Sequence, residues 1–186
     1  MPTRLPYDEL EIYLYTEGWD VSCFECVTSD LNAFLKEDAF KNQEELFGKT
    51  YLCCHSDDLV GYITFSTDII KKKEVPNENL GSVPYTEYPA IKIARLAVDK
   101  NYERRGVGRF LLLVALGKAV KISNEVGCRF ITVDSKKESI EFYKKGGFEL
   151  VKKYESSFYP TMYLDILPII KEMKRIKTTL EDFLKK

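Results

Sequence analysis

The feature that most constrains the fold is a glycine-rich turn that joins a strand pattern to a long apolar helix pattern. The segment ERRGVGRFLLLVA, residues 103–115, places Gly106 and Gly108 one residue apart behind a pair of arginines. A strand that ends at Val98 and feeds a helix through this turn leaves backbone N–H groups unpaired at the positive end of the helix dipole. The turn is therefore predicted to bind an anion such as a phosphate group.

Two familiar phosphate-binding loops do not fit this spacing. The third glycine of a dinucleotide fingerprint would fall at Leu111, and no Gly-Lys-Ser/Thr follows as a nucleoside triphosphate loop requires. The alternative to phosphate binding is a tight turn whose glycines serve backbone geometry alone. If the turn does bind phosphate, Arg104, Arg105 and Arg109 add positive charge around its amides.

The first third of the chain predicts a helical segment followed by a hairpin. After the cap candidates Ser29 and Asp30, the spacing of apolar residues predicts one helix or a broken pair over 31–47. The segments 50–55 and 59–67 are rich in strand-forming residues and are separated by three polar ones, which predicts a hairpin.

A central strand and a long helix flank the glycine turn. The segment 71–90 holds three prolines and several polar residues, and it predicts the longest irregular connection. The alternating segment 90–98 predicts the central strand. Apolar residues over 110–126 predict a largely buried helix that Gly127 ends in a left-handed conformation.

The last part of the domain predicts two further strand regions around a short helix. The segment 128–134 reads as a strand, and a capping-box spacing from Ser135 to Glu138 predicts a helix through Lys145. Final strands are expected over 148–155 and 161–166. This order of elements predicts an α/β sandwich on a mixed sheet, and we expect one domain over residues 1–166.

Residues 167–186 form a separate C-terminal helical extension in this prediction. Pro168 can start the helix. Its apolar residues repeat at alternating steps of four and three, at Ile169, Met173, Ile176, Leu180 and Phe183. Such a short amphipathic helix is not stable alone, so it is expected either to pack on the domain or to pair in a homodimer.

The chain shows no export or membrane signal. The start, MPTRLPYDELEIYLY, lacks a basic region before an apolar core, and no apolar run reaches the roughly 18 residues that span a bilayer. We expect a soluble, cytoplasmic protein without a membrane partner. The 5 cysteines are an odd number, which favours reduced thiols over a disulfide framework.

A zinc site is the alternative use of these cysteines. Cys23 and Cys26 are spaced as in zinc sites, and they could join Cys53, Cys54 and His55. Both cysteine pairs, however, lie in segments that alternate like strands and lack turn residues. No metal is therefore expected.

Charge is spread unevenly along the chain. Residues 1–60 carry 4 lysines and arginines against 13 acidic residues, and the remainder carries 24 against 16. The basic portion includes the glycine turn, which suits a ligand that bears phosphate. The run Lys71 to Lys73 is interpreted as a solvated loop.

The sequence ARLAVDKNYERRGVGRFLL, followed by VDSKKESIEFYKKGGFE, resembles the GNAT superfamily of acetyl-CoA-dependent N-acetyltransferases. In that family a splayed strand and a Q/R-x-x-G-x-G/A loop hold the pantetheine and the pyrophosphate, and a later helix carries a tyrosine before a Gly-Phe pair. Glu103 stands where the family usually has Gln or Arg. The resemblance implies a mixed, mostly antiparallel sheet flanked by helices, with acetyl-CoA as cosubstrate.

The resemblance also implies the site residues. The cofactor would be bound by Leu96, Ala97, Val98, Arg104, Arg105, Gly106, Val107, Gly108 and Arg109. The backbone N–H of Val98 would donate to the developing oxyanion, and Tyr143 would protonate the departing sulfur. The alternative role for Tyr143 is that of a core aromatic on a helix face.

Several further blocks look like the GNAT branch that contains toxins acetylating the amino group of aminoacyl-tRNA. These blocks are DVSCFECVTSDLNAFLKEDAFKNQ, GYITFST, RLAVD and YPTMYLDI, so the resemblance extends to about residue 166. Val27 replaces a glycine that often follows the cysteine of the first block. A toxin of this branch would also have an antitoxin partner.

The sequence offers no evident general base. His55, the one histidine, follows two cysteines on a predicted strand, which favours a structural role, whereas Glu87 or Asp134 could act through water. An α-amine has a pKa of about 8, and a lysine side chain has one of about 10.4. At neutral pH a much larger fraction of the α-amine is therefore already deprotonated and able to attack. The acceptor is therefore expected to be a low-pKa amine, and a small molecule, a peptide and an aminoacyl-tRNA all stay open. The hypothesis from another class is a non-catalytic CoA-binding module.

Overall fold

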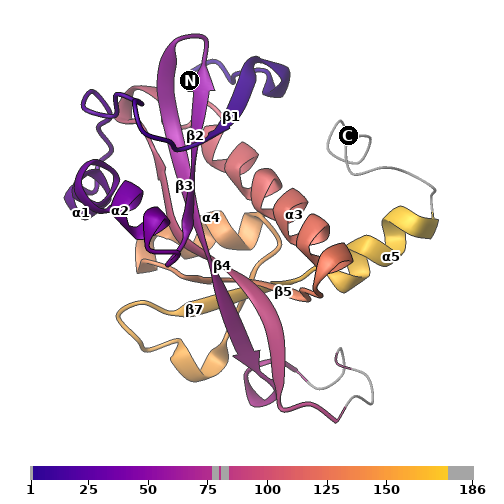
Figure 1. Ribbon diagram of the computed structural model, residues 1–186. Helices are drawn as coiled ribbons and strands as arrows, with labels where there is room; N and C mark the ends of the chain where they lie inside the picture. Colours follow the sequence, from indigo (N-terminus) through magenta and orange to yellow (C-terminus); the bar gives the residue numbers. More distant parts are fainter. Residues whose placement is uncertain (1, 77–79, 81–83, 176–186) are drawn as a thin grey trace. The chain divides into compact units, whose positions relative to one another are not determined.

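The computed structural model describes residues 2–76, 80 and 84–175 of the 186-residue chain (Figure 1). Its strands form one seven-stranded sheet in the order β1-β2-β3-β4-β5-β7-β6. The predicted fold class, a mixed and mostly antiparallel sheet with flanking helices, is confirmed. The chain divides into two compact units: unit 1 comprises Met1–Ser66 and Ile93–Leu112, and unit 2 comprises Thr67–Lys92 and Leu113–Lys186.

Unit 1 is built on the antiparallel strands β1 (Leu10–Leu14), β2 (Lys49–His55) and β3 (Asp58–Lys71). The predicted hairpin is confirmed: β2 pairs with β3, and Ser56 in the turn takes a positive φ of 54°. Strand β1, which pairs with β2, was not predicted. Its five residues expose three side chains, so it carries too little apolar alternation to be recognised from sequence.

The helical segment of unit 1 is continuous but irregular. It consists of α1 (Ser29–Ala33), a π-helical turn (Phe34–Asp38) and α2 (Ala39–Glu44), so of the two predicted alternatives, one helix or a broken pair, the structure has one helix with an irregular middle turn. Thr28, rather than either predicted cap residue, holds the N-cap position with an extended backbone. A π-helical turn inside a helix often marks a functional site.

The strand predicted over residues 20–27 is wrong, because this segment is irregular. Its backbone groups bond to nearby polar side chains instead of to a strand. Asp20 accepts from the N–H of Ser22 at 2.9 Å, and the Asn32 side chain bonds both the N–H and the carbonyl of Cys26 at 2.8 and 2.9 Å. These local hydrogen bonds compete with a sheet ladder.

The core of unit 1 packs the helical segment against the sheet. Its largest buried side chains include Phe24, Leu35, Leu52 and Tyr62. The hydroxyl of Tyr62 donates to the carbonyl of Leu31 at 2.8 Å, so the buried phenol is satisfied and ties the strand to α1.

Gly61 of β3 has no side chain, which allows Ala97 and Val107 to lie close to its backbone inside unit 1. A Cβ at this position would lie 2.9 Å from the carbonyl oxygen of Ala97 and 3.2 Å from the Val107 side chain. Any side chain there would displace either the end of β4 (Glu87–Val98) or the first turn of α3 (Val107–Glu125).

Unit 2 contains β5 (Phe130–Asp134), β6 (Glu149–Leu150) and β7 (Thr161–Asp165). Strand β7 pairs antiparallel with both β5 and β6. The strand predicted over 148–155 is only two residues long, because the chain turns into a 3-10 helix at Lys152–Tyr154. The core of this unit is formed by Ile70, Val75, Leu80, Tyr88, Ala90, Phe130, Val151 and Tyr163.

The predicted helix ends are largely confirmed. Helix α3 stops before Gly127, which has a φ of 95°, and α4 (Ile140–Lys145) stops before Gly147, which has a φ of 87°. The predicted capping box is wrong: the Ser135 hydroxyl donates to the carbonyl of Lys136, and a 3-10 turn over Lys137–Ser139 precedes α4.

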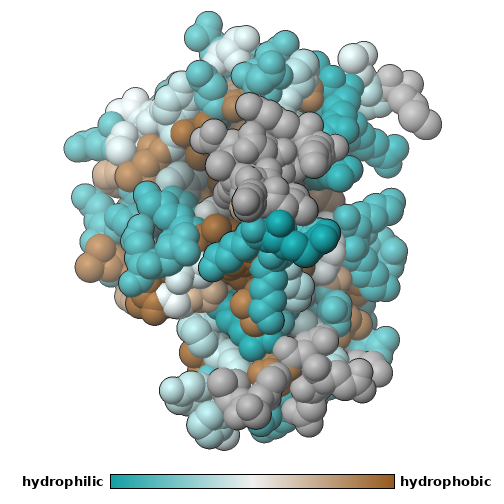
Figure 2. All heavy atoms as spheres, turned by 90° about the vertical axis from the view of Figure 1, so that its right-hand side faces the viewer, coloured by the Kyte–Doolittle hydropathy of each residue, from teal (hydrophilic) through white to brown (hydrophobic). Residues whose placement is uncertain are grey.

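Helix α5 (Leu167–Arg175) follows β7, as predicted for the C-terminal extension. Met173, one member of the apolar stripe, is buried. The other predicted members Ile176, Leu180 and Phe183 lie outside the described residues. Among the helices that the structure describes, none is long and apolar enough to cross a membrane. The face of the molecule in Figure 2 carries mainly hydrophilic side chains, with hydrophobic ones scattered among them.

Candidate active site

The direction of each backbone N–H group at the end of β4 follows from one hydrogen bond to β3. The N–H of Asp99, the residue after the strand, donates to the carbonyl of Val60 in β3 at 2.9 Å. Successive N–H groups of an extended strand point to opposite edges. The N–H groups of Val98 and Leu96 therefore point away from β3.

Asp99 fixes the chain as it leaves β4. Its carboxylate is buried and accepts from the N–H of Glu25 at 3.0 Å and from the N–H of Asn101 at 2.9 Å. The N–H of Lys100 also donates to the carbonyl of Glu25. Asp99 thus locks the start of the glycine turn onto the irregular segment of unit 1, a role that sequence analysis did not assign.

The glycine turn exposes its amides as predicted. Arg104 and Gly106 take left-handed conformations with φ of 58° and 94°, and α3 begins at Val107. The first helical hydrogen bond runs from Phe110 to Gly106 at 3.0 Å. Among the described residues of unit 1, no backbone hydrogen bond is donated by the N–H groups of residues 103–109. Unpaired amides at a helix N-terminus are groups that can bind an anion.

The three arginines of the turn differ in their surroundings. Arg105 is engaged within the protein: its Nε donates to the carbonyl of Thr3 at 3.2 Å, its guanidinium lies 5.0 Å from the ring centre of Tyr102, and its carbonyl accepts from Leu5 at 2.9 Å. Arg104 and Arg109 are exposed. They carry the charge that is available to a phosphate group.

Arg4 is a further cation at this turn that the sequence did not reveal. A Cβ on Gly106 would lie 3.1 Å from Cγ and 3.3 Å from Nε of Arg4, so the arginine lies directly against the glycine. Its guanidinium is 4.5 Å from the ring centre of Tyr7, which packs in turn on Phe110 of α3 at 5.4 Å. About 100 residues of sequence separate Arg4 from Gly106, and no local pattern links them.

Tyr143 lies in α4 of unit 2 and is buried, with 7% of its surface exposed. Its ring packs edge-on against Phe142 at 5.0 Å and Phe148 at 5.5 Å. The carbonyl of Tyr143 accepts from Phe148 and Gly146, so the Gly-Gly-Phe turn closes directly behind it. Burial raises the pKa of Tyr143, and the phenol therefore keeps its proton throughout the neutral range.

The candidate general bases all have other partners or stand exposed. His55 Nε2 lies 3.0 Å from Glu9 Oε2, which supports the structural role expected for it. Asp134 binds the Lys92 ammonium at 2.5 Å and the Thr161 hydroxyl at 2.8 Å. Glu87, at the start of β4, is exposed.

The cysteines are free thiols with Cys23 alone exposed. Burial raises the pKa of the Cys53 thiol to about 12, which disfavours the thiolate that zinc would require. Across the described ranges 2–76, 80 and 84–175, no group of three or more His, Cys, Asp or Glu residues is placed to hold a metal ion.

The family model described as "Acetyltransferase (GNAT) family" matches residues 13–148. A tRNA-acetylating toxin of Mycobacterium tuberculosis is 27% identical over 132 residues, which cover 70% of this chain and 79% of that toxin.

Two solved structures share the fold. AtaT complexed with acetyl-methionyl-tRNA superposes with a TM-score of 0.79 at 21% identity, covering 88% of this chain and 99% of the other. A tyrosine-to-phenylalanine mutant of AtaT, bound to the C-terminus of the antitoxin AtaR and to acetyl-CoA, gives a TM-score of 0.71 at 22% identity, covering 87% and 96%.

Proposed function

Because the chain belongs to the acetyltransferase (GNAT) family and is an acetyl-CoA-dependent acetyltransferase, we propose that it acetylates a primary amine by direct attack, and that this amine is the α-amino group of an aminoacyl-tRNA. The observation that carries the acceptor assignment is the 27% identity to a tRNA-acetylating toxin over 70% of the chain.

The glycine turn fits the diphosphate of coenzyme A. The left-handed Gly106 lets the backbone face a ligand without a side chain, and the unpaired amides of residues 105–109 supply several donors. Arg104, Arg109 and Arg4 would add charge. We propose that Leu96, Ala97 and Val98 bind the pantetheine arm as an added strand would, through the groups that point away from β3. When bound, acetyl-CoA supplies the reactive thioester.

The Val98 N–H would donate to the carbonyl oxygen as negative charge develops there. One such preorganised donor is typically worth about 10²- to 10³-fold in rate. The C–N bond forms, the C–S bond breaks, and the amine loses its extra proton to water. Tyr143 would give its proton to the departing sulfur and regain one from solvent. Burial raises the pKa of the phenol, so Tyr143 is protonated and able to donate at neutral pH.

Two of the three candidate bases are engaged within the protein and the third, Glu87, is exposed, which favours an amine that is partly neutral at pH 7. His55 and Asp134 are both held in hydrogen bonds, to Glu9 and to Lys92. An α-amine with a pKa near about 8 is about one-tenth neutral at pH 7, whereas a lysine near about 10.4 is almost fully charged. This difference of more than two pKa units supports an aminoacyl ester over a lysine side chain.

The decisive experiment incubates the purified full chain with labelled acetyl-CoA and a pool of aminoacylated tRNAs, next to deacylated tRNA, peptides with free lysines and small amines. Label is expected on the aminoacyl group of charged tRNA, and a cell-free translation reaction should be inhibited in parallel. Labelling of small amines or lysines with no labelled aminoacyl-tRNA would refute the acceptor assignment, while the acetyltransferase assignment would stand.

We further propose two partners for this chain. The antitoxin in the AtaT complex supports a partner antitoxin here, which should suppress acetylation at equal molar ratio. The C-terminal extension, residues 167–186, is proposed either to pack on the acetyltransferase domain of residues 1–166 or to pair in a homodimer. Light scattering of the full chain would distinguish a monomer from a dimer.

A further inference from the structure

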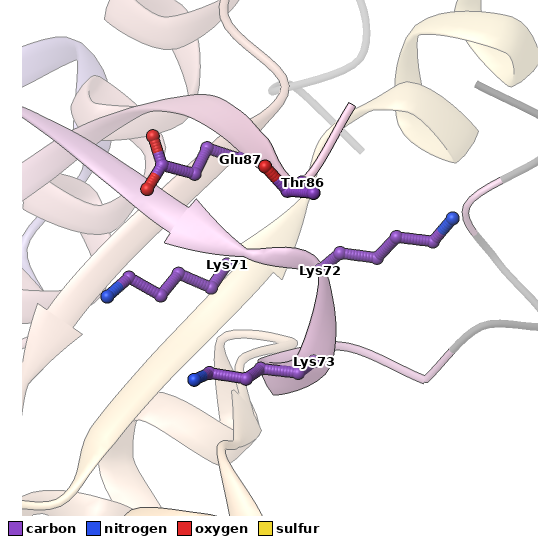
Figure 3. Close-up of a pocket in the computed structure, with 5 residues that line it drawn as sticks. All are labelled: Lys71, Lys72, Lys73, Thr86 and Glu87. Atoms are coloured by element: carbon purple, nitrogen blue, oxygen red, sulfur yellow. The ribbon is translucent and has the colours of Figure 1, made fainter. Parts of the chain in front are cut away.

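We infer that the end of β3 and the 3-10 turn that follows it, Lys72–Glu74, form a docking surface for the RNA backbone in unit 2, made by Lys71, Lys72 and Lys73 with Tyr85 beside them. This inference rests on the proposed function, because it names the part of the protein that would bind the tRNA. Together with Thr86 and Glu87, the three lysines line a cavity of about 520 Å³ (Figure 3).

The lysines stand on a fixed piece of backbone rather than on a loose loop. The N–H of Lys72 donates to the carbonyl of Thr86 at 2.9 Å. This hydrogen bond joins the residue after β3 to the residue before β4. On either side of the run, Ile70 is 1% exposed and Val75 is 5% exposed, and both belong to the core of unit 2. The charged run is therefore anchored at both ends.

The acidic side chain that follows the lysines in sequence is already used inside the turn, and Glu87 lines the cavity with them. One carboxylate oxygen of Glu74 accepts from the N–H of Lys71 at 3.0 Å, and the other accepts from the Tyr154 hydroxyl at 2.8 Å. Within the described part of the chain, none of the three ammonium groups forms an ion pair. Their charge is left for a partner.

The ammonium groups diverge. Figure 3 shows Lys71 and Lys73 pointing to one side of the turn and Lys72 pointing to the other. A single small anion could not be held by all three. A polymer that carries one charge per repeat can engage diverging lysines, and each neutralised phosphate releases a counterion and adds to the affinity.

An exposed aromatic beside the lysines favours RNA over an acidic protein. Tyr85, which precedes Thr86, is 67% exposed, and Lys153 lies 5.2 Å from the ring centre of Tyr154. Bases stack on exposed aromatic rings, whereas carboxylate side chains gain nothing from them. Unit 2 also carries 19 lysines and arginines against 14 acidic residues, while unit 1 carries 9 against 15.

The test measures binding of fluorescein-labelled, deacylated tRNA by anisotropy at several salt concentrations. The variant replaces all three lysines (Lys71→Gln, Lys72→Gln and Lys73→Gln). Its control has the same net charge and replaces three exposed lysines on α3 and α5 (Lys121→Gln, Lys171→Gln and Lys174→Gln). The first variant should bind about tenfold or more weakly, and the slope of log affinity against log salt should fall by about two. The control should change little.

Two further measurements identify the partner class. Tyr85→Ala should weaken tRNA binding by about tenfold, the loss typical of one stacked base, with an unchanged salt slope. Poly-glutamate should compete far less well than unlabelled tRNA at equal charge. Equal competition by poly-glutamate would overturn the RNA assignment in favour of an acidic protein.

These experiments distinguish a failure of the docking-surface hypothesis from a failure of the proposed function. If both lysine variants bind tRNA equally well and with the same salt slope while aminoacyl-tRNA is still acetylated, the docking surface is refuted and the function stands. If the first variant alone loses tRNA binding but no aminoacyl-tRNA is ever labelled, the surface stands and the function is refuted. Acetyl-CoA binding, measured by calorimetry, should be unchanged in every variant and shows that each one is folded.

Discussion

Tyr143 is the residue on which the acid step of the proposed reaction depends. Tyr143→Phe removes one hydroxyl and keeps the ring packed against Phe142 and Phe148. Turnover is expected to fall about 10²- to 10⁴-fold, the usual contribution of a general acid, while the dissociation constant for acetyl-CoA stays the same. Steady-state kinetics together with calorimetry would check both. Unchanged turnover would show that Tyr143 serves packing alone.

Arg4 is predicted to bind the phosphate part of the cofactor, because its Nε lies 3.3 Å from the Cβ position of Gly106. Arg4→Ala should weaken acetyl-CoA about tenfold, as the loss of one charge-assisted hydrogen bond implies. It should leave the affinity for S-acetylpantetheine, which lacks these phosphates, unchanged.

The matched control for Arg4 is Lys41→Ala, an exposed cation on α2 in the same unit. Calorimetry with both ligands should show no effect of this change. Equal losses for both ligands in Arg4→Ala would mean that Arg4 supports the turn structurally and does not contact phosphate.

At the scale of elements, the turn before α3 depends on the conformation of Gly106. Gly106→Ala places a Cβ at a φ of 94° and 3.1 Å from Arg4, which should cost about 1–2 kcal/mol of stability and weaken acetyl-CoA binding at least tenfold. Gly127→Ala is the control, because Gly127 has a nearly identical φ of 95° with nothing within 4 Å of the added Cβ. It should lose similar stability and no affinity.

The helices and strands also show where local sequence was sufficient to predict secondary structure. Helix α3 and strand β4 were predicted with nearly correct ends, because long apolar periodicity and Gly127 are local signals. The segment 20–27 was predicted as a strand from alternation, yet Asn32 and Asp99 supply its hydrogen bonds from elsewhere in the chain. Strand β1 was missed, because its five residues form a strand only through pairing with β2.

At the scale of the whole molecule, one buried thiol and two buried phenols should make the free energy of unfolding fall as the pH becomes alkaline. Burial raises the pKa of Cys53 to about 12 and raises the pKa values of Tyr62 and Tyr143. In the unfolded chain these groups ionise near their ordinary values of about 8.5 and 10. Their contribution is therefore complete below about pH 8 and is lost as the pH rises above it.

Urea denaturation at pH 7, 9 and 10.5 should accordingly give a falling free energy of unfolding. Cys53→Ala removes one of the ionising groups, so its stability should decline less steeply between pH 8 and 10.5 than that of the wild type, even though its stability at pH 7 is lower. A parallel decline in both proteins would contradict the assignment of this effect to Cys53.

By itself, the sequence determined the class of fold, the family and the position of the glycine turn that is proposed to bind phosphate. These depend on short-range signals, namely glycine spacing, apolar periodicity and a tyrosine before a Gly-Phe pair. Only the tertiary structure decided what surrounds the turn. Arg4 and Gly61 meet it from distant parts of the chain, Asp99, just before it, binds the backbone of Glu25, and the Tyr154 hydroxyl donates to Glu74 beside the lysine run. Such contacts depend on which segments pack together, and that is set by burial and hydrogen bonding across the fold rather than by neighbours in sequence.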